Sequence, residues 1–238
     1  MTWTRMRIWL SLTMVIVLAR CDRSERPLTE QHDLTHLGGE KGWILTSGVW
    51  ANPVIPVCWE STPTGQQVER GWVQNAVEIS WDANSRVDFT GWDKCASWTD
   101  RSVGVRIAVA DKGARTLGLG DAVSGVRDGV RLNFTYRKWN SWCAGSESLR
   151  ERCIRANAVH EFGHVLSFAH EHNRHDRPST CKAAAQGSNG DVILTPWDSL
   201  SIMNYCNEGR MRAGGVLSAG DITSVRQVYG VDSVPPMR

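Results

Sequence analysis

The chain has 238 residues, of which 41 % are hydrophobic and 22 % charged, the composition of a soluble globular protein. Its 27 Lys and Arg residues nearly balance its 25 Asp and Glu residues, which gives a net charge of +2. This balance gives no indication of a nucleic-acid partner or of a basic surface that binds membranes. The length allows one domain of ordinary size, or two small ones, with a hydrophobic core.

The first 21 residues are predicted to form an export signal. Arg5 and Arg7 provide a basic start, and the apolar run over residues 8–19 fits the core of a signal peptide better than a membrane span. Cys21 follows this run, as in the lipobox of bacterial lipoproteins, although that motif has a small residue where Arg20 stands. We therefore expect an exported protein, either secreted or periplasmic, whose only membrane attachment would be a lipid on Cys21.

The six cysteines that follow the signal support export. Their number is even and none of them forms a CxxC pair, so disulfides in an oxidising compartment are expected rather than a thiolate zinc site. We predict local pairing. The expected bridges are Cys58–Cys95, Cys143–Cys153 and Cys181–Cys206.

The chain after the signal divides into a polar segment and a patterned region. Residues 22–48 lack a clear period and are predicted to be a tether or a short pro-segment, and residues 49–238 to be one folded domain. Alternating or continuous apolar patterns indicate strands, and near-helical spacing of apolar residues indicates a first helix. The expected strands are 54–59, 87–90, 104–110 and 129–136, with an edge strand near 115–125, and the helix is 66–83.

The second half of the chain has two further helical signals separated by coil. A helix is expected over residues 148–167, and residues 173–200 are rich in Gly, Pro and Asp and therefore irregular. Ser218, with Asp221 three residues later, predicts the N-cap of a last helix. The fold class is therefore α+β: a single domain with a mixed, twisted sheet backed by two helices, then an irregular C-terminal half and a final helix.

A group of histidines lies in the predicted helix over 148–167. His160 and His164 are four residues apart, so both imidazoles lie on one face of the helix and can bind one ion. His170 can join them if the helix ends near Ser167 and the chain turns back. Three histidines leave the open position that a catalytic zinc ion requires. Glu161 lies beside the pair and can reach a water molecule without binding the metal.

This arrangement predicts the hydrolysis of peptide bonds with one Zn²⁺ ion as cofactor. A zinc ion lowers the pKa of its bound water and polarises the carbonyl of the bond to be cleaved. Glu161 would act as the general base that takes the proton from water, and would then deliver it to the leaving amine. The expected partner is a protein or peptide substrate, bound by pairing with the edge strand near residues 115–125. We expect a monomer.

The long histidine motif, followed by residues 201–205 (Ser-Ile-Met-Asn-Tyr), resembles the metzincin clan of zinc endopeptidases, and most of all its astacin-like family. The stretch over residues 170–177 is similar to the one that this family carries after its third ligand. The resemblance implies a metzincin-like fold with a Met-turn, in which Met203 forms an apolar floor under the metal. It also implies that Tyr205 caps or binds the zinc ion and then stabilises the oxyanion.

Three features depart from the family pattern. Ser167 stands where the family has Gly, at a turn that needs positive φ, and this costs about 1 kcal/mol for Ser. Glu171 corresponds to a residue that meets the buried amino terminus of the processed enzyme, but no processing site is recognisable. The family's pro-segment places an Asp on the zinc ion, whereas neither Asp22 nor Asp33 lies in a recognisable motif.

Ser167 also keeps a rival hypothesis open. The chain could be a non-catalytic zinc-binding or adhesion module that has the fold but lacks turnover. A branch closer to the matrixins is a further alternative, although Tyr205 argues against it. Since three other histidines are already expected to bind the metal, His172 and His175 are expected at the surface.

Overall fold

The computed structural model describes residues 42–97 and 104–231. All of them belong to one compact unit of the chain. The predicted export signal and residues 22–41 of the predicted tether lie outside the described residues. Within the described ranges, none of the helices has the length and apolar character needed to cross a membrane.

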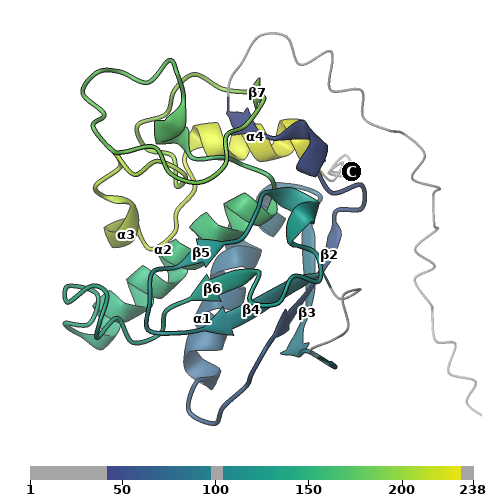
Figure 1. Cartoon of the computed structure of the whole chain (residues 1–238), viewed down its shortest axis with the longest axis vertical. Helices are drawn as coiled ribbons and strands as arrows, with labels where there is room; N and C mark the ends of the chain where they lie inside the picture. The colour runs from purple at the N-terminus through teal and green to yellow at the C-terminus, as the bar shows by residue number, and fades with distance from the viewer. Residues whose placement is uncertain (1–41, 98–103, 232–238) are drawn as a thin grey trace, which may run out of the picture. The chain divides into compact units, whose positions relative to one another are not determined.

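A mixed five-stranded sheet forms the first half of the fold (Figure 1). The strand order is β3-β2-β4-β6-β5, in which β5 pairs antiparallel with β6 and the other neighbours are parallel. The strands are β2 (Val54–Trp59), β3 (Asp88–Lys94), β4 (Val105–Val109), β5 (Arg115–Thr116) and β6 (Val130–Leu132). The mixed sheet and its short antiparallel edge strand confirm the expected architecture.

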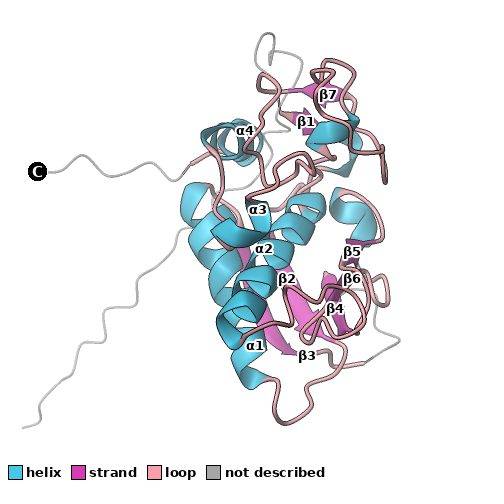
Figure 2. Cartoon of the chain, turned by 90° about the vertical axis from the view of Figure 1, so that its left-hand side faces the viewer, coloured by secondary structure: helices cyan, strands magenta, loops and turns pink. Residues whose placement is uncertain are grey.

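Two helices pack side by side against this sheet (Figure 2). They are α1 (Gln67–Val77), which a π-helical segment continues (Glu78–Asp82), and α2 (Glu147–Val165). The α2 helix begins where the Ser146 hydroxyl accepts a hydrogen bond from the Leu149 backbone N–H. Phe162 of α2 packs edge-on to Phe89 and stacked on Trp92 of β3, with ring centroids 4.8 and 5.5 Å apart. These aromatic contacts hold the C-terminal end of α2 on the sheet.

The C-terminal half has little regular structure, as expected. Its elements are η5 (Glu171–Asn173), α3 (Arg210–Ala213), α4 (Ala219–Tyr229) and β7 (Val192–Ile193), which pairs antiparallel with β1 (Trp43–Ile44). The remaining short elements of the described chain are the 3-10 turns η2 (Thr46–Gly48) and η4 (Gly120–Val123). Ser218 and Asp221 form the predicted capping box at the start of α4.

The predicted disulfides Cys58–Cys95, Cys143–Cys153 and Cys181–Cys206 are all present. The strand predicted over 129–136 is too long, because β6 ends at Leu132. There the Asn133 side-chain oxygen accepts hydrogen bonds from the backbone N–H groups of Thr135 and Tyr136. This local bond replaces strand pairing and turns the chain away from the sheet.

Candidate active site

The three predicted ligands meet at the C-terminal end of α2. His160 and His164 extend from adjacent turns of the helix, and His170 follows the turn after it. The Nε2 atom of His170 lies 3.2 Å from that of His160 and 3.1 Å from that of His164. All three side chains are buried. The structure therefore brings together the three histidines that the spacing predicted.

The second nitrogen of each ring fixes its tautomer. The Nδ1 atoms of His160, His164 and His170 each lie 2.8 Å from a backbone carbonyl oxygen. Since a carbonyl oxygen only accepts, each Nδ1 must carry the proton and donate it. The three Nε2 atoms that face one another are therefore lone-pair donors to a cation, oriented as metal-binding histidines are in other proteins.

The geometry of this cluster fits a zinc ion. Three nitrogens placed tetrahedrally at a zinc–nitrogen distance of about 2.05 Å are about 3.3 Å apart, close to the spacings found between the Nε2 atoms. Burial lowers the pKa of each ring, that of His164 to about 3, so all three stay neutral and able to bind a metal at neutral pH. His160, His164 and His170 are a sufficient donor set for one ion with an open position.

Ser167 makes the turn that delivers His170. It has φ of 74°, in the left-handed region where the family has Gly. The backbone N–H of Ser167 donates to the carbonyl of His164, and that of Phe168 to the carbonyl of Gly163, at 2.9 and 3.0 Å, the pattern of a Schellman motif. The Ser167 hydroxyl donates to the carbonyl of Leu45 at 2.6 Å. The serine thus adopts the glycine conformation and gains a hydrogen bond that glycine lacks.

Glu161 is buried on the side of α2 that faces a large cleft. One of its carboxylate oxygens accepts a hydrogen bond of 2.8 Å from the hydroxyl of Thr116 on β5. Burial raises the pKa of Glu161 to about 8, although Thr116 and the charges of Arg210 and Arg131 oppose this rise. A strongly shifted carboxyl group in a cleft is typical of a reacting group. No motif in the sequence points to Thr116, which lies 45 residues from Glu161 along the chain.

Residues 201–203, the predicted Met-turn, pack against the helix that carries His160 and His164. The carboxylate of Asp221 accepts hydrogen bonds from the Ser201 hydroxyl and the Ile202 backbone N–H, at 2.7 and 2.9 Å. This holds Met203 against α2 at Gly163, where a Cβ atom would lie 2.4 Å from the methionine sulfur. Gly163 is therefore the residue that lets the Met-turn approach the helix.

Tyr205 lies beside the histidines. Its ring centroid is 5.4 Å from that of His160, 4.7 Å from that of His170 and 4.5 Å from that of His172. The surface position predicted for His172 is wrong: the ring is buried, stacks on Tyr205 and accepts a hydrogen bond from the Tyr205 backbone N–H. The prediction considered His172 only as a possible metal ligand and not as a side chain that packs behind Tyr205. His175 is exposed, as expected.

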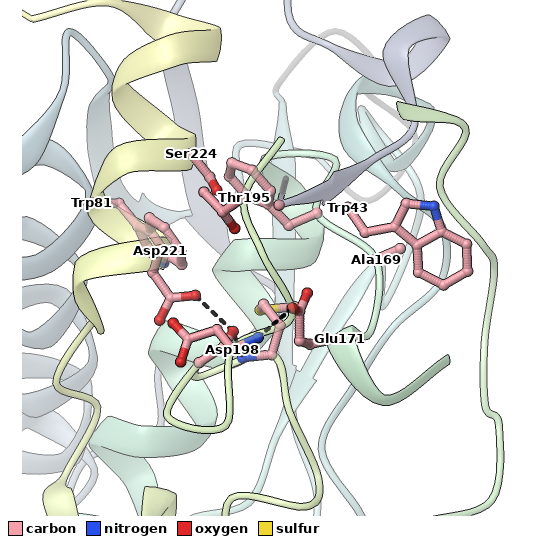
Figure 3. A pocket seen from close by; sticks show the side chains of 13 residues that line it. Trp43, Trp81, Ala169, Glu171, Thr195, Asp198, Asp221 and Ser224 are labelled. Atoms are coloured by element: carbon pink, nitrogen blue, oxygen red, sulfur yellow. Dashed lines mark hydrogen bonds between the residues drawn. The ribbon is translucent and has the colours of Figure 1, made fainter. Parts of the chain in front are cut away.

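Glu171 is buried and lines a different cavity from Glu161. Its carboxylate pairs with the Arg174 guanidinium at 2.9 Å and accepts a hydrogen bond from the Asp198 backbone N–H at 2.8 Å. A cavity of about 10 Å³ lies beside it, bounded also by Trp43 and Asp221 (Figure 3). In the described structure, Arg174 therefore supplies the positive charge that the family resemblance assigned to an amino terminus.

Comparison with known proteins identifies the fold. No family model and no curated protein matches the chain. A structure of myroilysin matches 81 % of this chain and 100 % of its own, at 18 % identity and a TM-score of 0.57. A crystal structure of myroilysin matches 81 % of this chain and 92 % of its own, at 18 % identity and a TM-score of 0.50.

High choriolytic enzyme 1, described as a hatching enzyme zinc-protease from the medaka fish Oryzias latipes, matches at 19 % identity and a TM-score of 0.46, over 78 % of this chain and 96 % of its own. The chain thus shares the fold of myroilysin. The α+β metzincin-like fold expected from the histidine motif and the Met-turn is confirmed.

Proposed function

We propose that this protein is a zinc-dependent endopeptidase. The observation that carries the proposal is the convergence of three Nε2 lone pairs, each fixed by an Nδ1–carbonyl hydrogen bond, beside a buried glutamate in an open cleft. Three nitrogen ligands with an open position are typical of catalytic zinc, whereas structural sites close all four positions.

A zinc ion at this site would act as a Lewis acid on the peptide carbonyl and make a water molecule more acidic. Glu161 would accept the proton of the attacking water on one carboxylate oxygen while the Thr116 hydroxyl holds the other. A cation at this site would oppose the rise that burial causes in the pKa of Glu161, so the carboxylate could accept this proton and later give it to the leaving amine. Thr116 is thus a positioning residue for the general base.

Tyr205 is proposed to stabilise the developing oxyanion through its hydroxyl. Stacking on His172 and the guanidinium of Arg210, 4.5 Å from the ring centroid, orient the phenol ring next to His160 and His170. Burial raises the pKa of Tyr205 above its usual value, so the hydroxyl keeps its proton and can donate it at neutral pH.

The substrate is proposed to be an extended peptide that pairs with β5. This strand is the last of the sheet order, and its Thr116 contacts Glu161, so a peptide along this edge would pass the general base. The three disulfides suit an oxidising compartment. We propose accordingly that the enzyme acts outside the cytoplasm, as a monomer; lipid attachment at Cys21 remains a prediction.

The test is an assay of metal content and peptide hydrolysis on the same preparation. The exported protein should contain one zinc ion per chain and cleave a quenched-fluorescence peptide library. A chelator should abolish cleavage, and added zinc should restore it. One zinc ion per chain without cleavage of any library member would instead support the rival, a non-catalytic zinc-binding module. Cleavage that a chelator leaves unchanged would contradict the proposal.

A further inference from the structure

An irregular segment of the chain, residues 181–190, supplies the second hydrogen-bond partner of His170. The Nδ1 atom of His170 donates to the Gln186 backbone carbonyl at 2.8 Å. Residues 182–190 include no helix or strand, and most of them, Gln186 included, are exposed. The carbonyls that hold the other two ligand rings belong to buried residues. Because exposed segments without regular structure open locally at low cost, the partner of the third ligand needs a constraint.

Hydrogen bonds provide part of this constraint. The Asn173 side chain donates to the Gln186 carbonyl at 2.7 Å and accepts from the Gln186 backbone N–H at 2.9 Å. The Arg177 guanidinium donates to the carbonyl of Ala183 at 2.8 Å. Both bonds of Asn173 are exposed, and water competes with exposed hydrogen bonds, so each contributes only a small net stabilisation. These contacts alone leave the segment able to lift from His170.

A disulfide provides the remaining constraint. Cys181, at the start of the segment, is bonded to Cys206, the residue directly after Tyr205. The Tyr205 backbone N–H donates to the Nδ1 atom of His172 at 3.2 Å, and the Cys206 backbone N–H donates to the Asn204 side chain at 2.9 Å. The bridge therefore joins the segment over His170 to the stretch of chain that places Tyr205 beside the histidines.

We propose that the Cys181–Cys206 disulfide is a positioning element of the zinc site. It keeps the Gln186 carbonyl on His170, which directs the Nε2 lone pair of that ring at the metal position, and it keeps Tyr205 beside the cluster. The inference rests on the proposed peptidase function and assigns a covalent support to its site. Groups that orient a metal ligand from behind commonly change metal affinity about 10- to 100-fold when they are lost.

The Cys58–Cys95 disulfide offers a matched control. It joins β2 to the residue that follows β3, and neither cysteine lines the cleft beside the histidines. Its two cysteines are 37 residues apart, whereas Cys181 and Cys206 are 25 apart. Since opening a longer loop frees at least as much chain entropy in the unfolded state, loss of Cys58–Cys95 should lower stability at least as much. A purely structural role would therefore give similar results for the two bridges.

The test compares the double variants Cys181→Ser/Cys206→Ser and Cys58→Ser/Cys95→Ser with the unmodified protein. Zinc affinity is measured by competition with a chromogenic chelator, well below the unfolding midpoint of each protein. We expect the first variant to bind zinc at least about tenfold more weakly and, at saturating zinc, to have a kcat about tenfold lower. Its KM should change little, because the proposed peptide site lies at β5. The second variant should unfold at a lower temperature but keep the zinc affinity and kcat of the unmodified protein.

The zinc measurement separates this inference from the peptidase function. A zinc affinity of the first variant within about twofold of the unmodified protein, or an equal loss in both variants, would overturn the positioning role. If the unmodified protein binds zinc but cleaves no peptide, the peptidase function fails, and the zinc affinities alone still decide whether the disulfide supports His170.

A second measurement uses the folded, unmodified protein and does not require that a variant folds. Among the six cysteines that the structure describes, Cys206 alone is not buried. A water-soluble phosphine, which is itself oxidised to the phosphine oxide, should therefore reduce Cys181–Cys206 to two thiols before the other bridges. Alkylation and mass spectrometry identify the opened bridge. Zinc release that follows the labelling of Cys181 and Cys206 supports the proposal, whereas labelling with zinc and activity retained would overturn it.

Discussion

Glu161 and Glu171 each follow a histidine of the cluster, yet they lie in contrasting surroundings. Glu161 faces the cleft, where the one hydrogen bond that its carboxylate makes within the described residues comes from the neutral hydroxyl of Thr116. Glu171 faces the interior, where a charged guanidinium and a backbone N–H hold its carboxylate. A carboxylate that must react has few hydrogen-bond partners and no ion pair, whereas a carboxylate that holds a turn in place has both. The contrast predicts that neutralising the two glutamates has opposite consequences.

The largest expected effect is on catalysis at Glu161. Glu161→Gln keeps the shape and can still accept from Thr116, but it cannot take a proton. We expect kcat/KM to fall about a thousandfold, the scale of general acid–base catalysis, while one zinc ion per chain is retained. Glu171→Gln is the matched control and should keep most of the turnover of its folded fraction. Retained activity in Glu161→Gln would contradict the role of the general base.

The next largest effect is expected on the stability of the metal-free chain, which should depend on pH through the titration of Glu161. The folded pKa of Glu161, about 8, is above its unfolded value of 4.5. The folded state therefore binds more protons between these values, and the natural protein loses stability as the pH rises through that range. Glu161→Gln does not titrate, so it should be ~4 kcal/mol more stable than the natural chain at pH 8 and about equal at pH 4.5. Urea unfolding at both pH values measures this, and an equal difference at the two would contradict the burial of an uncompensated carboxyl group.

At Glu171 we expect the opposite change in stability, a lower free energy of unfolding when the carboxylate is neutralised. Arg174 is buried, and although Asp176 also pairs with it, Glu171→Gln removes one of its anions. We expect a loss of ~2 kcal/mol in the free energy of unfolding at pH 7, since a buried cation is left less compensated. Burial raises the pKa of Glu171 from 4.5 to about 7, although the ion pair with Arg174 opposes that rise. The folded natural chain therefore binds more protons than the unfolded chain between these values and gains stability as the pH falls, so the loss in the variant should grow below pH 7. Unchanged urea unfolding at pH 6 would contradict this account.

The smallest effect on stability is expected at the turn that Ser167 makes after α2. Ser167→Ala keeps the positive φ and loses the hydrogen bond to Leu45, at a cost of ~1 kcal/mol. Ser167→Gly loses the same bond but relieves ~1 kcal/mol of backbone strain, so its stability should stay near that of the natural chain. Thermal unfolding of the two variants side by side makes the comparison. Equal losses in both would show that the strain at this turn is negligible.

Local patterns account for what the sequence predicted well. The His160–His164 spacing, the capping residues Ser218 and Asp221, and the pairing of nearby cysteines are all properties of short segments, and the structure bears them out. The resemblance to a family added the Met-turn. Each of these signals depends on residues that are close in sequence or on a motif of fixed spacing.

Contacts between distant segments were not predictable in the same way. The bond from Thr116 to Glu161 joins an edge strand to a helix, and the stacking of His172 on Tyr205 joins two irregular segments. Arg210 reaches the cleft from a four-residue helix with no periodic pattern. Only the folded structure brings these side chains together. The contacts of Thr116 and His172 and the position of the Arg210 charge could therefore not be predicted from the sequence.

The most direct test of the central claim is a zinc titration of the metal-free protein followed by peptide cleavage at each point. The account predicts that activity rises in proportion to bound zinc and saturates at one ion per chain, and that His164→Ala abolishes both tight binding and cleavage. Full occupancy by one zinc ion with no cleavage of any peptide, or cleavage that does not depend on zinc, would contradict it.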